Sequence, residues 1–340
     1  MCRRDRPMKQ PSIIEDLKDP VLLPDMTEHV EVVQTHISIV FVADRFVYKV
    51  KKPVNFGFLD FSTLEKRHHY CRREVELNRR LAKDIYLDVL PITYDGKRHT
   101  MTGGEGKPVE YAVKMRRIPA DKLMKSMFQR GELTGDHLKN ITEIIANFHS
   151  DALRTMEIDK FGEPEAFRVN TDENFAQVEK YIGMTIPFKH FDAIKKWTAS
   201  FYKTKGRKFE ERIKAGRIRD CHGDLHMEHV CLAEGISIID CIEFNDRFRY
   251  SDTVADIAFL LMDLEYHGGE DFSKTTWEYY KECANEGNVD SLVTFYKIYR
   301  AFVRGKVNSF QLDDTNITSK IKEHVLQTAT KYFQLAYSYL

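Results

Sequence analysis

The chain has 340 residues, with 52 Lys and Arg against 52 Asp and Glu, and 42% of its residues are hydrophobic. This balance gives no overall field that would attract nucleic acid or an anionic membrane, so neither is expected as a partner. The length exceeds what one hydrophobic core usually supports, which predicts two lobes or domains. Residues 1–6 are mostly charged, and neither the apolar stretch of a signal peptide nor a membrane span follows them. A cytoplasmic protein is therefore expected, and its oligomeric state is left open.

Six cysteines are spread along the chain, and none forms a CxxC pair. Cys221, Cys231 and Cys241 recur every ten residues, a regularity that would also suit a metal site. Isolated cysteines of a cytoplasmic protein are more often reduced and buried. The sequence therefore favours small apolar side chains at these positions.

The first third of the sequence alternates as a β-sheet does and contains one helical segment. The expected elements are strands at 28–35, 37–43 and 45–52, a helix from a capping pattern at 62–65 to about Lys83, and strands at 90–94 and 110–115. Together they predict a small α+β domain over residues 1–115.

Two lysines on one strand are candidates for binding phosphate groups. Lys49 and Lys51 point to the same face, because side chains two residues apart on a strand do so. Lys49 is favoured, with Glu74 of the following helix as its ion-pair partner, because Tyr48 and Val50 flank it in mid-strand. Lys51 remains the competing candidate, and an exposed strand would leave both lysines solvated.

The loop that begins at Thr35 precedes the second strand and ends at Ser38. Its backbone amides and the two hydroxyl groups would suit a cover over phosphates, which makes Ser38 a candidate nucleotide contact. The loop contains no glycine, so a plain hairpin is an equally good interpretation.

Beyond Pro119 the apolar spacing becomes that of helices. The expected helices are one capped by Asp136 with an apolar face at 138–148, and others at 172–183, 188–216, 253–266, 273–286, 289–310 and 316–338. They predict a helical C-terminal domain over residues 116–340, interrupted by a strand-like stretch at 229–242.

The stretch 221–243 combines a polar loop with a β-branched run that ends at Asp240. Phosphoryl transfer needs a carboxylate to receive the hydroxyl proton and ligands for a metal ion that bridges phosphates. Asp224 is the candidate proton acceptor, Asp240 the candidate metal ligand, and His229 stands where a second metal ligand is expected. Glu243 would either assist the metal or form a hydrogen bond. The alternative is an ordinary polar turn followed by a strand that ends in an aspartate.

These residues together resemble the aminoglycoside phosphotransferase and choline kinase superfamily, whose catalytic loop reads H-G-D-[LI]-H-x-x-N. Residues 222–226 match the first five positions, and His229 replaces the final Asn. The resemblance implies that His222 and Asp224 belong to the catalytic loop. It also implies that Asp256 is the structural aspartate that holds this loop in place.

The resemblance covers about residues 30–310 and implies an α+β, bilobal, protein-kinase-like fold. A small antiparallel-sheet lobe, residues 1–115, would bind the nucleotide. Met115, a candidate nucleotide contact, lies just before the connection to a mainly helical lobe, residues 116–340. Some members of a similar, uncharacterised bacterial branch carry an additional P-loop kinase domain, whereas this sequence contains no G-x-x-x-x-G-K-[ST] motif. The narrower likeness to this branch rests on residues 47–67, 73–81 and 240–249.

The function expected from motif and resemblance is transfer of the γ-phosphoryl group of ATP to a hydroxyl group of a small molecule, with Mg²⁺ as the metal. Imidazole suits softer metals than Mg²⁺, so His229 leaves several outcomes open. Glu228 would replace it as a ligand, Mn²⁺ would be preferred, Asp240 alone would bind the metal, or activity would be weakened. The helix at 289–310 carries Arg300, Arg304 and Lys306, which would meet an anionic acceptor or form a solvated face.

Two other functions fit parts of the pattern. A nucleotide-binding pseudokinase with a regulatory role would keep the fold and lose catalysis. A zinc hydrolase would use His222, Asp224, His226 and His229, but no second cluster in the sequence supplies the remaining ligands.

Overall fold

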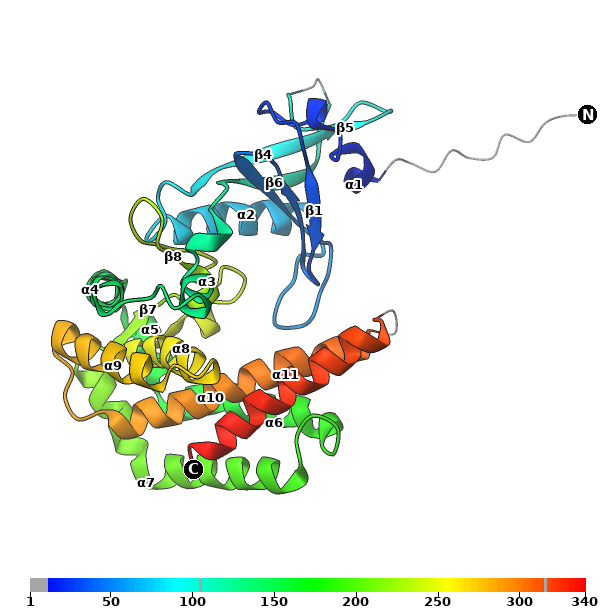
Figure 1. The fold of residues 1–340 in the computed structure, drawn as a ribbon. Coiled ribbons are helices and arrows are strands. Elements are labelled where there is room, and N and C mark those ends of the chain that lie inside the picture. Colours follow the sequence, from blue (N-terminus) through cyan, green and yellow to red (C-terminus); the bar gives the residue numbers. More distant parts are fainter. Residues whose placement is uncertain (1–11, 104–105, 315–316) are drawn as a thin grey trace, which may run out of the picture. The chain divides into compact units, whose positions relative to one another are not determined.

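The computed structural model describes residues 12–103, 106–314 and 317–340 (Figure 1). The chain divides into two compact units. The N-terminal unit extends to Lys122 and also contains Ala233–Asn245, whereas the C-terminal unit consists of Leu123–Leu232 and Asp246–Leu340. The sequence placed the boundary at residues 115–116, where strands give way to helices. That expectation did not include residues 233–245, which return to the N-terminal unit.

Among the described residues, the N-terminal unit contains an antiparallel sheet of six strands in the order β1-β2-β3-β6-β4-β5. Its strands and helices are β1 (Glu31–Gln34), β2 (Ser38–Val42), β3 (Phe46–Lys51), β4 (Tyr86–Tyr94), β5 (His99–Thr100), β6 (Pro108–Arg116), α1 (Ile13–Asp16) and α2 (Leu64–Asn78). The five strands expected from the sequence are all present, and the short β5 is additional.

Each face of this sheet has its own apolar core. Tyr48 and Val50 of β3 contribute to a cluster that also contains Leu17 and Leu23 from the region of α1. The opposite face contacts α2, which contributes Cys71 and Val75 to a second cluster together with Tyr86 and Val113. Because side chains alternate along β3, its two lysines face the α2 side.

Helix α2 starts where the capping pattern predicts, with the Thr63 hydroxyl accepting a hydrogen bond from the Lys66 amide at 3.3 Å. It ends at Asn78 rather than near Lys83, because the chain then turns into β4, whose first residue, Tyr86, donates its amide to the Ala82 carbonyl. The helical prediction was therefore correct in place and about one turn too long.

The C-terminal unit is mainly helical (Figure 1). Its elements are α3 (Met124–Gln129), α4 (Gly135–Asp151), α5 (Met156–Asp159), α6 (Pro164–Val178), α7 (Phe188–Lys214), α8 (Thr253–Tyr266), α9 (Glu270–Ala284), α10 (Asp290–Phe310), α11 (Ser319–Ser338) and the short strands β7 (Ile218–Asp220), β8 (Val230–Cys231) and β10 (Tyr250–Asp252). Helix α8 is buried along nearly its whole length, as expected for a helix that is apolar on all sides. It joins α6, α7, α10 and α11 in one apolar core.

Three expectations about individual elements are corrected. Thr134, not Asp136, caps α4, and its hydroxyl accepts from the His137 amide at 3.3 Å. The helix expected at 172–183 begins at Pro164, where proline at the first turn suits a helix start. The run before Asp240 forms only the two-residue strand β9 (Ser237–Ile238), and Asp240 follows it with a left-handed φ of 62°.

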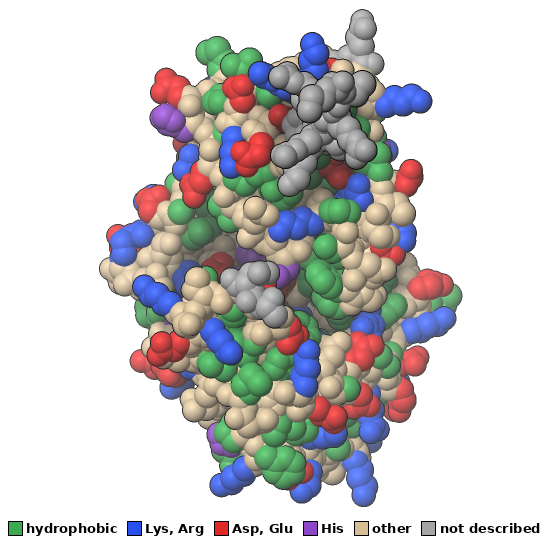
Figure 2. Space-filling model, turned by 90° about the vertical axis from the view of Figure 1, so that its right-hand side faces the viewer, with side chains coloured by type: hydrophobic (Ala, Val, Ile, Leu, Met, Phe, Trp, Pro, Cys, Tyr) green, Lys and Arg blue, Asp and Glu red, His purple; other side chains and the backbone are tan. Residues whose placement is uncertain are grey.

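The described cysteines are all free; Cys283 is exposed, and the other four are buried, as expected. Cys2 lies outside the described residues. No described helix is both long and apolar enough to cross a bilayer. On the face drawn in Figure 2, basic and acidic side chains are interspersed without a continuous area of one sign.

Candidate active site

The loop that carries Asp224 is fixed from beneath by Asp256 of α8. The Asp256 carboxylate accepts hydrogen bonds from the backbone amides of His222 and Gly223, each at 2.8 Å. The His149 ring lies at 3.2 Å from the same carboxylate. Gly223 has a φ of 85°, a conformation that favours glycine, so the loop turns sharply here. The structural role that the resemblance implied for Asp256 is therefore confirmed.

A second buried side chain holds the same loop from α10. Arg300 donates to the Gly223 carbonyl at 2.8 Å and to the Ala255 carbonyl at 3.2 Å. Its guanidinium also lies over the Phe259 ring, 4.9 Å from the centroid. Arg300 therefore neither meets an acceptor nor forms a solvated face. Lys306 is likewise engaged, because it donates to the side-chain oxygens of Asn174 and Gln177.

The anchoring of this loop predicts an acid-sensitive stability. Asp256 is completely buried, which alone would raise its pKa, but His149, His222 and Arg300 outweigh burial and lower the pKa from 3.8 to about 2. The shift corresponds to about 2 kcal/mol of stability. Because the folded-state pKa lies below the unfolded value, this stability is present above about pH 4 and is lost as the pH falls towards 2.

In Asp256→Asn this contribution is absent at every pH. The difference in denaturant midpoint between wild type and Asp256→Asn should therefore shrink as the pH is lowered from 5 to about 2. A difference that stays constant over this range would contradict the assignment. Asp172→Asn, at an exposed aspartate of α6 that pairs with Arg168, is the control.

Asp224 itself is a partly exposed carboxylate at the end of the anchored loop, with 32% of its side chain accessible. Burial would raise its pKa, but His226, His229 and Arg304 outweigh burial and hold the pKa of Asp224 well below its usual range. The group is therefore ionised at every physiological pH. An ionised, partly accessible carboxylate can accept a hydrogen bond from a hydroxyl group of a ligand.

The other histidines of the loop have different surroundings. His222 is buried, and its Nδ1 accepts from the Asp224 amide at 3.3 Å, so its ring supports the turn. His229 Nδ1 donates to the Asp224 carbonyl at 2.8 Å. Glu228, the proposed substitute ligand, forms an ion pair with Lys125 at 2.5 Å.

In the N-terminal unit, two lysines and three acids form one cluster. Lys49 Nζ lies 2.9 Å from Glu74 Oε1 and 2.8 Å from Asp240 Oδ1. Lys51 Nζ lies 2.6 Å from Glu74 Oε2 and also contacts Glu243. The expected pair of Lys49 and Glu74 is present, and Lys51 is equally close to the same glutamate.

Exposure separates the two lysines. The Lys49 side chain is 18% accessible, whereas that of Lys51 is 1% accessible. Burial would lower the pKa of each amine, but the neighbouring carboxylates raise both above the usual value. Both amines therefore stay charged, and Lys49 is the one able to reach a ligand.

Asp240 has the backbone strain that often marks a functional residue. A φ of 62° is unusual for a non-glycine residue. The Tyr86 hydroxyl accepts a hydrogen bond from the Asp240 amide at 3.1 Å, and the Cys241 amide donates to Asn78 Oδ1 at 2.8 Å. These bonds hold the turn so that 44% of the Asp240 side chain is accessible.

The two remaining candidates for nucleotide contact lie in the sheet. Ser38 is buried at the start of β2, and its hydroxyl has no hydrogen-bond partner among the described residues. The Thr35 hydroxyl accepts from the Ser38 amide at 3.0 Å, which gives a compact turn. Met115 of β6 is partly buried against the α2-side core. Contact of either residue with a nucleotide stays a prediction.

Sequence reasoning missed Lys51 as a structural partner of Glu74, and it left Glu243 undecided. The sequence signal that could have found this contact is the alternation of side chains along β3, which places both lysines on the face that contacts α2. Neither Asn78 nor Tyr86 carries a recognisable motif, because each acts on a backbone amide of residues 240–241 that are distant in sequence.

Comparison with solved structures identifies the class of fold. The structure superposes on a choline/ethanolamine kinase family protein from Mesorhizobium loti with a TM-score of 0.50 and 14% identity, covering 92% of each chain. It superposes on an amicoumacin kinase, solved with AMP-PNP and Ca²⁺, with a TM-score of 0.53 and 10% identity, covering 94% of this chain and 92% of the other. The chain therefore has the bilobal kinase-like fold of these proteins, and the expected fold class is confirmed.

Sequence comparison finds relatives of undefined activity. An uncharacterised protein of Mycobacterium tuberculosis and one of Mycobacterium bovis are each 35% identical to this chain over 279 residues. The match covers 82% of this chain and 54% of each relative, so the chain spans about half the length of these curated relatives. No protein-family model matches the chain.

Proposed function

We propose that the protein is an ATP-dependent phosphotransferase that transfers the γ-phosphoryl group to a hydroxyl group of a small molecule. The observation that carries the proposal is the loop at Asp224, whose amides are bonded to buried Asp256 while the Asp224 carboxylate remains ionised and partly accessible. Phosphoryl transfer needs a preorganised carboxylate of this kind, because little other covalent chemistry falls to the protein.

Asp224 would orient the acceptor hydroxyl by accepting its hydrogen bond. The hydroxyl oxygen forms a bond to the γ-phosphorus, the bond from that phosphorus to the β,γ-bridging oxygen breaks, and ADP leaves. The hydroxyl proton passes to an Asp224 oxygen. Because the low pKa makes Asp224 a weak base, alignment of the hydroxyl is its main contribution, with proton transfer late in the reaction.

The N-terminal unit offers groups for the nucleotide and its metal. Lys49 carries the accessible ammonium group for the phosphates, and Glu74 holds it in place. Asp240 presents an accessible carboxylate, the type of oxygen ligand that Mg²⁺ prefers, so the residues fit a magnesium ion. A bound Mg²⁺ would neutralise charge on the β- and γ-phosphates.

The test is a screen of a metabolite extract for molecules that gain the mass of one phosphoryl group only with ATP and protein present. Asp224→Ala is the blank, because it removes the proposed proton acceptor. A product formed by wild type and absent with Asp224→Ala supports the proposal. Equal product with both proteins would exclude Asp224 from the chemistry.

Lys49 should affect nucleotide binding far more than stability. In Lys49→Met, Glu74 keeps its ion pair with Lys51, and the Asp240 carboxylate remains accessible to water. The free energy of unfolding should therefore change little. Loss of a charge-assisted hydrogen bond to phosphate should weaken ATP affinity about 10–100-fold, measured by titration calorimetry.

Lys114→Met is the matched control, because Lys114 is 17% accessible, lies on neighbouring β6 and pairs with Asp25. If Lys49→Met and Lys114→Met bind ATP equally well, Lys49 is not the phosphate-binding lysine. If Lys49→Met unfolds instead, its role is structural.

The second candidate, a nucleotide-binding pseudokinase with a regulatory role, is favoured by one observation. The resemblance places a metal-binding Asn where this chain has His229, and its Nδ1 is bonded to a backbone carbonyl. Calorimetric binding of ATP without any transfer product in the screen, with Mn²⁺ as well as Mg²⁺, would select this function. Restoration of transfer by His229→Asn would identify the residue responsible.

A further inference from the structure

We propose that Asp224, His226 and His229 form a binding site for a divalent transition-metal ion of the zinc type. All three residues belong to one short segment of the C-terminal unit, which runs from the anchored turn into the helical turn Met227–His229. Two imidazoles and one carboxylate make a ligand set that suits zinc and related metals. The site shares His229 with the expected magnesium position and differs from it in using Asp224 and His226 in place of Asp240.

The three side chains already lie almost as close together as such an ion requires. One ligand atom of each lies within 4.8 Å of the other two. His226 Nε2 is 3.7 Å and His229 Nδ1 is 3.6 Å from the same atom, Asp224 Oδ2. Zinc–ligand bonds of about 2.0–2.1 Å place tetrahedral ligands about 3.4 Å apart. Small side-chain rotations would therefore close the site.

His226 supplies an independent reason to expect a ligand. Only 3% of its side chain is accessible, and its Nε2 lies 3.7 Å from Asp224 Oδ2, beyond the usual length of a hydrogen bond. Its ring lies 3.9 Å from that of His229 and 5.4 Å from that of Phe259, measured between centroids. A buried polar group whose partner lies too far away for a good hydrogen bond is costly. A metal ion bound by His226 and Asp224 would remove that cost.

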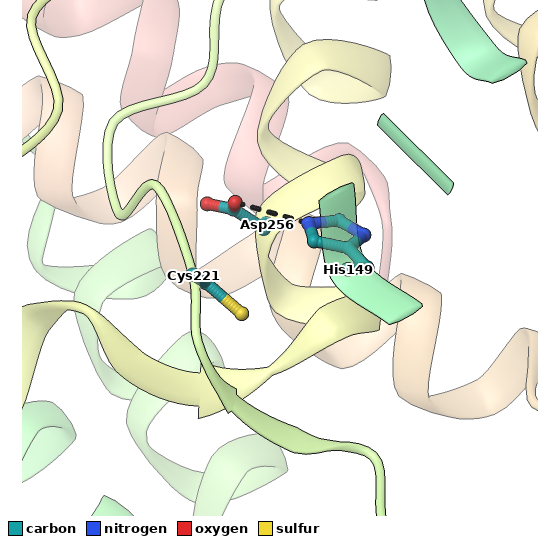
Figure 3. A group of neighbouring side chains, drawn as sticks. All are labelled: His149, Cys221 and Asp256. Carbon is teal, nitrogen blue, oxygen red and sulfur yellow. Dashed lines mark hydrogen bonds and ion pairs between the residues drawn. The ribbon is translucent and has the colours of Figure 1, made fainter. Parts of the chain in front are cut away.

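The cluster of His149, Cys221 and Asp256 meets the same distance criterion but lacks this feature (Figure 3). Both His149 ring nitrogens are engaged, with the Tyr280 hydroxyl at 2.7 Å and with Asp256 at 3.2 Å. The Cys221 thiol donates to the Ser251 carbonyl at 3.4 Å, and burial raises its pKa well above the usual value. Each ligand atom of this second cluster therefore already has a role, and we expect it to bind no metal.

The surroundings of the three ligands predict how tightly an ion would be held. Glu228 is paired with Lys125 and is not needed as a ligand, so water would complete the coordination. Arg304 acts on Asp224 electrostatically and opposes a cation there. His229 Nδ1 donates to a carbonyl, so binding through this nitrogen would release its proton and break that hydrogen bond. We therefore expect reversible binding rather than a permanent structural zinc.

The test is equilibrium binding to the full chain without nucleotide, so it does not depend on phosphotransferase activity. Zn²⁺ is titrated by calorimetry, and Co²⁺ serves as a spectroscopic probe because its visible absorption reports coordination number. The expected result is one ion per chain, a tetrahedral cobalt spectrum and no displacement by excess Mg²⁺. Absence of stoichiometric binding, an octahedral spectrum or displacement by Mg²⁺ would each overturn the proposal.

Two variants and one control locate the ion. His226→Gln and His229→Asn should each weaken Zn²⁺ binding more than about tenfold, since loss of an outer partner alone costs about 10–100-fold. His226 is buried, so its substitution threatens folding. If His226→Gln unfolds at a lower temperature than wild type, the result for His229→Asn, at a more accessible position, decides the test. The control replaces His68 and His69 of α2, adjacent histidines that line a groove with Arg72. Zinc binding that survives His229→Asn but disappears in this control refutes the assignment.

Discussion

Replacing Asp224 by Asn should reduce phosphoryl transfer about 10²–10⁴-fold, the range that a positioned acid–base group contributes. The amide has the same shape but cannot accept the hydroxyl proton. The backbone hydrogen bonds of residues 222–224 to Asp256 and His229 do not involve the Asp224 carboxylate, so the loop should keep its conformation. The measurement is kcat with the acceptor that the extract screen identifies.

Two further measurements separate loss of chemistry from loss of structure. ATP affinity of Asp224→Asn should remain close to that of wild type, and the variant should stay folded with a lower thermal midpoint, because the fold stabilises the ionised Asp224 carboxylate. Asp172→Asn, at an exposed aspartate of the same unit, should keep full activity. If Asp224→Asn retains more than about a tenth of the wild-type rate, Asp224 is not the proton acceptor, because the loss falls below the expected range.

The same residue predicts the acid limb of the pH profile. The pKa of Asp224 is lowered, so the carboxylate stays ionised until the pH falls below the usual aspartate value of 3.8. The wild-type rate should therefore show no loss above about pH 4 that depends on Asp224. An inflection between pH 5 and 7 would have to arise from another group.

The catalytic loop could be predicted from sequence because its information is local. Residues 222–226 form one motif, and the resemblance also names Asp256, which the structure places under the loop. The strands of the N-terminal sheet were predictable because their side chains alternate, and α8 because it is apolar on all sides over nearly its whole length. Element ends were less certain, as with α4, because Thr134 and Asp136 are both good caps and only backbone geometry chooses between them.

Placement of residues 233–245 in the N-terminal unit could not be predicted from local pattern. The segment is held there by bonds from Asp240 and Cys241 to Tyr86 and Asn78, which lie more than 150 residues earlier. In the sequence, Tyr86 and Asn78 look like ordinary strand and helix residues. The left-handed backbone of Asp240 was equally hidden, because the β-branched run before it predicts an extended strand.

The different roles of Lys49 and Lys51 also could not be predicted from local sequence pattern. Strand alternation places both on the α2 side, and both reach Glu74. What separates them is Glu243, which comes from the returning segment and contacts Lys51. Lys51 is thereby enclosed between two glutamates, and only 1% of its side chain is accessible to a ligand. The division of roles between a binding lysine and a structural lysine is therefore a property of tertiary structure.

Lys51→Met should be the most destabilising single substitution in this cluster, by about 3–5 kcal/mol, because it leaves a buried carboxylate without its counter-ion. Glu74 keeps Lys49 at 2.9 Å, so the cost falls mainly on Glu243. The measurement is the denaturant midpoint of the full chain. Lys66→Met, which removes an accessible ion pair with Asp60 at the start of α2, should change it little.

The pH dependence of Lys51→Met identifies the carboxylate responsible. Burial already raises the pKa of Glu243 in the wild type, against the opposing effect of Lys51. Without the Lys51 ammonium group the pKa should rise further, so the folded variant binds a proton more tightly than the unfolded chain. Stability then falls as the pH rises, and the variant should lie closest to wild type under mildly acidic conditions.

Adding Glu243→Met should recover most of the lost stability, because buried ion pairs can often be replaced by apolar side chains of similar size. A double variant no more stable than Lys51→Met would show that Glu74, not Glu243, depends on Lys51.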